Sequence, residues 1–188
     1  MVKANSIKII IFSIFLASLY GCKNPDDSRQ LVLNPPSADS SFSIEELYNL
    51  ASNKNSRTIS LTDSILYATS DQNTRSEAFY IRGLYYANID QLDEALKYFD
   101  SSIIENYTQV DAYIEKSILL NNQKKFEAAI QTLEIALHLT KNNTDLYYCL
   151  GKSNEGLGKI IDAHKWYGLA VSIEPDFEEA KKGYNRTK

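Results

Sequence analysis

The chain has 188 residues, of which 44% are hydrophobic and 23% are charged, and its formal net charge is −4. This length suits one compact domain with short additional segments. The acidic balance argues against nucleic acid as a partner, because nucleic-acid binding needs clustered Lys and Arg side chains.

Residues 1–21 have the pattern of a secretory signal. Lys3 and Lys8 lie in a basic start, and an apolar run follows from Ile9 to Tyr20. A basic start, a short apolar core and a small residue before a cysteine are typical of such a signal. The run is shorter than the roughly 20 apolar residues that a membrane-spanning helix needs.

The signal ends in Leu19-Tyr20-Gly21-Cys22, which resembles a bacterial lipobox. The resemblance implies cleavage before Cys22, a diacylglycerol thioether on its sulfur, and acylation of its new amine, for example by palmitate. Several acyl chains hold a protein to a membrane far more firmly than one. Removal of the two signal lysines would change the formal charge from −4 to −6. An ordinary secretory signal followed by a free thiol is the alternative.

Residues 22–41 are predicted to form a flexible tether that begins at the lipidated Cys22. They contain three of the four prolines and many polar residues, and about 20 such residues span on the order of 25 Å. Lys23 after the cysteine favours the outer membrane in the enterobacterial sorting scheme. Asp26 and Asp27 loosely resemble an export tag of surface lipoproteins in Bacteroidota. The expected location is therefore the cell envelope, at the periplasmic or surface face of the outer membrane.

Residues 42–75 are predicted to form a degenerate first helical hairpin. The stretch from Ser43 to Glu46 has the pattern of a capping box at a helix start. Leu61, Ile65 and Ala68 follow at i, i+4 and i+7, as on one face of a second helix. A helical cap outside the repeat register explains the same residues, and the sequence leaves both interpretations open.

From residue 76 onward, a pattern of large and small residues recurs at a constant interval, the one that separates Ala95 from Ala129 and Ala129 from Ala163. The small residues are Gly83, Ser117 and Gly151 in the first half of each copy, and Ala95, Ala129 and Ala163 in the second half. The large residues that accompany them are Phe79, Tyr113 and Tyr147, then Phe99, Leu133 and Tyr167. Three copies in phase, at residues 76–109, 110–143 and 144–177, resemble the tetratricopeptide repeat (TPR) in their period.

The resemblance implies an all-α fold, a right-handed α-α superhelix of stacked helical hairpins. A small residue lets the two helices of a hairpin approach closely, and a larger side chain there would cost about 1–3 kcal/mol. One hairpin cannot bury both apolar faces, so such repeats stack. Residues 178–188 are expected to form a C-terminal capping helix with Asp176 as its cap. Arg82 and Lys116 depart from the leucine usual in the family, which weakens the prediction of tight packing there.

The resemblance also implies that the first helices of the repeats line a concave, partner-binding surface. Its candidate residues are Tyr80, Leu84, Asn88, Ile114, Ile118, Asn121, Asn122, Tyr148, Lys152 and Glu155. Apolar and amide side chains together suit an extended peptide or an amphipathic helix of a partner protein. The carboxylate-clamp variant of the family needs Lys and Asn where Tyr80, Ile114 and Tyr148 stand, so a clamp is not expected. Packing inside the stack is the alternative role for these three side chains and for Ile118.

The sequence shows no pattern of a catalytic, metal or cofactor site. His138 and His164 lie on different repeats, and neither has a second ligand at metal-binding spacing on its own helix face. A glycine-rich phosphate loop after a strand is also missing from the sequence. Cys149 lies in the middle of a predicted helix and is interpreted as a small buried apolar residue. We therefore expect a protein without enzymatic activity, cofactor or metal.

Together these features predict a membrane-anchored TPR lipoprotein that acts as a protein–protein interaction scaffold in the bacterial cell envelope. Its partner would be an envelope protein or peptide, with the membrane bound through the lipid. The alternative is an assembly or pilotin-like factor for a secretion, pilus or outer-membrane complex. An envelope enzyme or polysaccharide-binding module would need a catalytic pair or an aromatic shelf that the sequence does not show.

Overall fold

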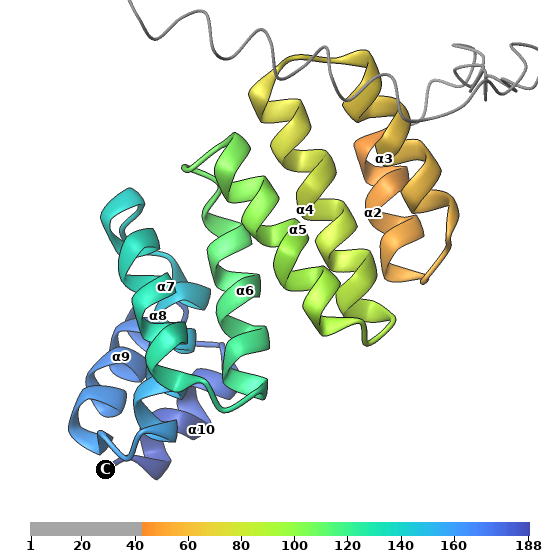
Figure 1. The fold of residues 1–188 in the computed structure, drawn as a ribbon. Coiled ribbons are helices and arrows are strands. Elements are labelled where there is room, and N and C mark those ends of the chain that lie inside the picture. Colours follow the sequence, from red (N-terminus) through yellow and green to blue (C-terminus); the bar gives the residue numbers. More distant parts are fainter. Residues whose placement is uncertain (1–42) are drawn as a thin grey trace, which may run out of the picture. The chain divides into compact units, whose positions relative to one another are not determined.

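The computed structural model describes residues 43–188, which form nine α-helices and no strand (Figure 1). The predicted signal, Cys22 and the tether lie outside the described residues. The helices are α2 (Ile44–Ser52), α3 (Arg57–Ala68), α4 (Gln72–Asn88), α5 (Leu92–Glu105), α6 (Val110–Asn122), α7 (Phe126–Leu139), α8 (Thr144–Gly156), α9 (Ile160–Ile173) and α10 (Glu178–Arg186). The predicted all-α fold is confirmed. Within this described part, no helix has the length and apolar character needed to cross a membrane.

The helices pair in chain order, and the predicted small residues lie at the contacts within the pairs. A methyl group added to Gly83 of α4 would lie 2.6 Å from the ring of Phe99 in α5. In the same way, a methyl group at Gly151 of α8 would lie 2.6 Å from the ring of Tyr167 in α9. Ala95, Ala129 and Ala163 are fully buried on the second helices. The prediction that small residues allow the close approach of the paired helices is confirmed.

Two apolar clusters run through the stack and contain four of the six large residues of the pattern, Phe99, Tyr113, Leu133 and Tyr147. Tyr167 is also fully buried, whereas Phe79 is only partly buried. One cluster is centred on Phe99 and Ile81 and includes Leu47 of α2. The other contains Leu133 and Leu150 and continues into Ala180 of α10. Each cluster takes residues from successive helix pairs, as expected when one hairpin alone cannot cover its apolar faces.

Arg82 and Lys116 join successive helix pairs through polar contacts. The guanidinium of Arg82 in α4 donates to Thr62 Oγ1 at 2.9 and 2.7 Å and to Asp63 Oδ1 at 2.5 Å, both in α3. Lys116 in α6 donates to Asp100 Oδ1 in α5 at 2.5 Å. Arg82 is only 6% exposed. The expectation of weaker packing at Arg82 was wrong, because its hydrogen bonds satisfy the buried charge.

The second helix of the first hairpin packs two of its three predicted residues, Leu61 and Ile65, against the first apolar cluster, but its most buried residues are two threonines that the sequence did not predict. Thr58 and Thr62 of α3 are fully buried, whereas Ala68 is exposed and Leu61 and Ile65 are partly buried. Both threonine hydroxyls donate to backbone carbonyls, Thr58 to Asn55 and Thr62 to Thr58, at 2.8 Å. Burial of these polar groups is possible because their hydrogen bonds are made inside the protein. At the start of α2, the Ser43 side chain accepts a hydrogen bond from the backbone N–H of Glu46.

The last helix, α10, packs on α9 and closes the second apolar cluster. The ring of Tyr184 stacks on His164 with their centroids 4.2 Å apart. The N-terminal cap residue of α10 is Phe177, and no side chain forms a capping hydrogen bond with this helix. The expectation that Asp176 caps α10 was wrong, because the helix begins one residue later than the capping pattern requires.

Candidate partner-binding surface

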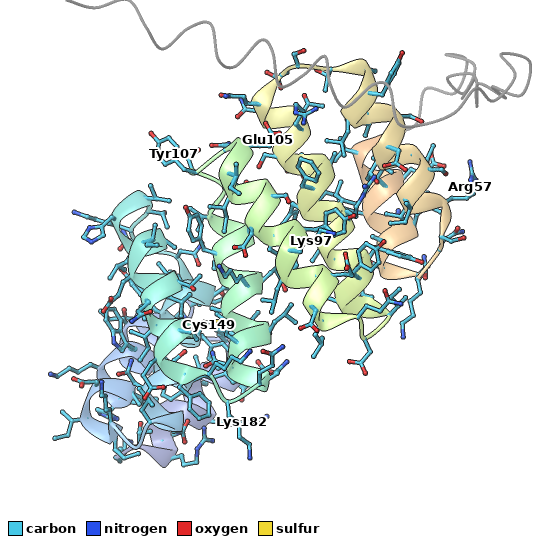
Figure 2. All side chains as sticks on the ribbon, viewed as in Figure 1. Arg57, Lys97, Glu105, Tyr107, Cys149 and Lys182 are labelled. Carbon is cyan, nitrogen blue, oxygen red and sulfur yellow. The ribbon has the colours of Figure 1, made fainter. Side chains whose placement is uncertain are left out.

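The first helices α4, α6 and α8 line a pocket of about 310 Å³. We call it the first-helix pocket, and its apolar walls are Tyr80, Ile114, Ile118, Tyr148 and Phe177. Four of these five residues are candidates from the sequence, and Phe177 was not predicted. Cys149, labelled in Figure 2, lies on the α8 side of the pocket.

The two tyrosines are held by aromatic contacts with the core and still line the pocket. Tyr80 is 8% exposed, and its ring centroid lies 5.9 Å from that of Phe99. Tyr148 is half-buried, with ring centroids 5.9 Å from Tyr167 and 5.0 Å from Phe177. Burial is also the main reason that the pKa of the Tyr148 hydroxyl is raised. These side chains therefore contribute to the core and to the pocket wall together.

The remaining six candidates do not line the first-helix pocket. They are Leu84, Asn88, Asn121, Asn122, Lys152 and Glu155. Asn88, Asn122 and Lys152 are exposed, Leu84 and Glu155 are partly buried, and Asn121 is buried. They lie further along α4, α6 and α8 than the pocket residues do, so the sequence pattern predicted a longer surface than the pocket covers.

Three of these six have structural partners inside the stack, and one of them is Asn88, whose Nδ2 donates a hydrogen bond to the Ala51 carbonyl of α2 at 3.3 Å. The Glu155 carboxylate accepts hydrogen bonds from Arg186 at 2.5 and 2.7 Å and from the Tyr167 hydroxyl at 2.7 Å. Its pKa is lowered, chiefly by the bond from Arg186. Asn121 accepts a hydrogen bond from the Ser153 hydroxyl at 2.9 Å. Glu155 and Asn121 therefore join neighbouring helices.

Sequence reasoning missed the acidic side chains of the first-helix pocket, which are Asp111, Glu115 and Asp145. The sequence contained a signal for Asp111 and Asp145, because they lie one repeat length apart and Glu77 lies one repeat length before Asp111. Burial raises the pKa of Glu115, and the charges of Asp111 and Asp145 raise it further. Partial desolvation likewise raises the pKa of Asp111, although the residue is exposed, and the charges of Glu77 and Asp145 raise it further. The carboxylates are therefore close enough to repel one another.

Cys149 is an inert thiol in this setting. It is 2% exposed, and burial raises its pKa to about 12. The thiolate is the nucleophilic form of cysteine, so a thiol with this pKa is unreactive near neutral pH. Within residues 43–188, no group of three or more His, Cys, Asp and Glu side chains is placed to hold a metal ion.

Solved structures with the same arrangement of helices identify the fold. The TPR domain of Arabidopsis OM64 superposes with a TM-score of 0.60 and 21% identity, covering 62% of this chain and 97% of that one. The first TPR of Spaghetti (RPAP3), bound to the HSP90 peptide SRMEEVD, superposes with a TM-score of 0.60 and 20% identity, covering 61% of this chain and 91% of that one. The chain has a TPR fold. The predicted TPR solenoid is thereby confirmed.

Another solved structure covers more of the chain. MamA from AMB-1 superposes on this TPR fold with a TM-score of 0.59 and 12% identity, over 76% of this chain and 83% of that one. At the level of sequence, comparison with family models and with curated proteins gave no match. With identities this low, the similarity concerns the fold and not a shared ligand.

Proposed function

We propose that this TPR protein is a lipid-anchored interaction scaffold of a bacterial cell envelope, and that its first-helix pocket receives a segment of a partner protein. The observation that carries the proposal is that Tyr80, Ile114 and Tyr148, from three successive first helices, line one pocket. Aromatic and aliphatic side chains in one concave site can bury the apolar side chains of a bound peptide.

One of the similar structures supports peptide binding as a use of this fold. The first TPR of Spaghetti (RPAP3) is described as bound to the HSP90 peptide SRMEEVD. That peptide carries acidic residues near its end, whereas the first-helix pocket of this chain contains Asp111, Glu115 and Asp145. Like charges brought together across an interface oppose binding. We therefore expect this chain to bind a different class of peptide.

The test of the scaffold role is capture of a partner by the full chain, with one substitution inside the first-helix pocket and one outside it. Ile118 lines the pocket, whereas Ile135 is 52% exposed and lies on the second helix α7. After crosslinking in cells, Ile118→Asp should lose the captured partner, and Ile135→Asp should retain it. Circular dichroism checks that both variants are folded. The proposal fails if no protein is captured, or if Ile118→Asp captures as well as the unchanged chain.

The lipid anchor is tested separately at Cys22. Metabolic labelling with a clickable palmitate analogue should label the full chain, and Cys22→Ala should abolish the label. The variant should also leave the membrane fraction, because its acyl chains supply the membrane affinity. Retention of the label in Cys22→Ala would show that this cysteine is not the lipidated residue.

A further inference from the structure

The first-helix pocket has an apolar wall and an acidic wall. Tyr80, Ile114 and Tyr148 occupy equivalent positions in three repeats, as their equal spacing along the chain requires. Asp111 and Asp145 lie three residues before Ile114 and Tyr148 in the same helices, so each repeat places a carboxylate one turn from an apolar side chain. Glu115 adds a further carboxylate on α6, and it is partly buried.

Within residues 43–188, none of the three pocket carboxylates has a cation as its partner. The ion pairs of the described part are formed elsewhere, for example between Arg82 and Asp63 and between Arg186 and Glu155. The described hydrogen bonds also do not include the side chains of Asp111, Glu115 or Asp145 as acceptors.

The neighbouring charged groups do not neutralise this acidic wall. Glu77, at the equivalent position in α4, accepts hydrogen bonds from the Tyr48 hydroxyl and, at 2.8 Å, from Gln109 Nε2. It adds a negative charge beside Asp111. The nearby basic residue Lys152 holds its Nζ atom 5.8 Å from the ring centroid of Tyr148. Lys152 is exposed and does not line the first-helix pocket.

Glu115 is partly buried, and Asp111 and Asp145 are exposed. Like charges that are gathered on one surface destabilise the folded chain unless a cation joins them. Asp111 and Glu115 are separated by four residues on one helix, where like charges repel. A bound cation would relieve this repulsion, and the apolar wall beside it would bury the rest of its segment. Charge and shape therefore restrict the same pocket to one class of ligand.

Resting on the proposed function, we propose that the occupant of the first-helix pocket is a basic, apolar segment of a partner protein. It places Lys or Arg side chains against Asp111, Glu115 and Asp145 and apolar side chains against Tyr80, Ile114 and Tyr148. Arg and Lys both donate hydrogen bonds to carboxylates, and an Arg guanidinium can also stack on an aromatic ring. Acidic peptides are excluded by the same charges.

The experiment selects a random 12-residue peptide display library on the purified full chain. We expect the selected peptides to be enriched in Lys and Arg together with apolar residues. Their binding is then measured by fluorescence anisotropy at low and high salt, and the affinity should fall as salt screens the charges. The triple variant Asp111→Asn/Glu115→Gln/Asp145→Asn should bind these peptides about tenfold more weakly.

A matched triple variant controls for the change in net charge. Asp93, Glu127 and Glu174 are exposed residues outside the first-helix pocket. The variant Asp93→Asn/Glu127→Gln/Glu174→Gln removes the same three charges and should retain the affinity of the unchanged chain. Circular dichroism verifies the fold of both triple variants, and Glu115→Gln alone provides a milder version with a smaller loss.

The outcomes separate this inference from the proposed function. Selected peptides that are neutral and apolar, and that bind both triple variants equally, would overturn the charge preference and leave peptide binding in place. Acidic peptides would overturn it outright. A pocket triple variant that changes only the oligomeric state of the chain would make a second copy the occupant and also overturn the inference. If no peptide is selected and no partner is captured in cells, both proposals fail.

Discussion

Two kinds of single residue have opposite effects on the stability of this protein: glycines that permit close helix packing, and a carboxylate whose negative charge has no cationic partner. Gly83 and Gly151 are needed because a ring from the paired helix occupies the space of a side chain. Glu115 is the opposite case, since burial and neighbouring carboxylates raise its pKa. The first kind of residue stabilises the fold, and the second kind lowers stability at a surface that we assign to binding.

The glycine contact predicts the effect of a single added methyl group. Gly151→Ala should destabilise the protein by about 1–3 kcal/mol, because the methyl group would overlap the ring of the fully buried Tyr167. Urea denaturation followed by circular dichroism measures the change. Gly168→Ala is the matched control, since its methyl group would meet the edge of Tyr184 at the longer distance of 3.1 Å. Equal effects at the two positions would contradict the packing argument.

The pocket carboxylates predict a gain in stability when one charge is removed. Glu115→Gln should stabilise the protein near pH 7 by about 0.2–0.5 kcal/mol, because Asp111 lies four residues earlier on the helix. The folded-state pKa of Glu115 is raised above its unfolded value. The folded chain therefore holds more protons than the unfolded chain between these two values, and stability falls as pH rises through that interval.

The advantage of Glu115→Gln should consequently shrink as the pH falls and Glu115 becomes protonated. Denaturation curves at a series of pH values from neutral to acidic measure this trend. Glu127→Gln, a substitution at an exposed residue of α7, is the control. A Glu115→Gln variant that is less stable than the unchanged chain near neutral pH would show that the carboxylate has a stabilising contact.

At the scale of elements, each helix pair of the three repeats turns through one residue with a positive φ. Asp90, Lys124 and Gly158 have φ values of 63°, 58° and 73°. They are one repeat length apart, so the same backbone bend recurs in each repeat. Glycine adopts this conformation without steric cost, whereas other L-residues pay about 1–2 kcal/mol. The third repeat therefore has the least strained turn.

This turn geometry predicts that Lys124→Gly stabilises the protein. The expected gain is about 0.5–1 kcal/mol, because the relief of the positive φ exceeds the extra flexibility that glycine gives the unfolded chain. The hydrogen bond from the Lys124 backbone N–H to the Asn121 carbonyl, 2.9 Å long, would be retained. Thermal denaturation measures the gain. Glu127→Gly, inside the first turn of α7, should instead lose about 1 kcal/mol; the same sign of change for both would contradict the prediction.

At the scale of the whole described body, neighbouring helix pairs stabilise one another through local contacts. Arg82 joins α4 to α3, Lys116 joins α6 to α5, and Leu150, at the equivalent position in α8, belongs to the second apolar cluster. In repeat proteins each unit contacts mainly its neighbours. A weakened contact should therefore loosen the adjacent hairpin more than distant ones.

The contacts of Arg82 provide the test of this local behaviour. Arg82→Ala should cost about 1.5–3 kcal/mol, since hydrogen bonds to a buried charged group are lost. Hydrogen exchange measured by mass spectrometry should speed up in α2 and α3 and remain unchanged in α8, α9 and α10. Lys116→Ala, whose partner Asp100 is 49% exposed, should cost about 1 kcal/mol or less. Equal acceleration of exchange in every helix would show that the stack unfolds as a single unit.

The sequence by itself determined the helical hairpins of this protein and their stacking. The spacing of Gly83, Ala95 and their equivalents is enough to predict these, because close helix pairs require small residues at recurrent positions. The tertiary structure alone decided which candidates share a pocket, since this depends on how α4, α6 and α8 pack and where Phe177 lies. It also brought Asp111, Glu115 and Asp145 together. The spacing along α6 predicts the repulsion between Asp111 and Glu115, whereas the approach of Asp145 depends on how α8 packs against α6.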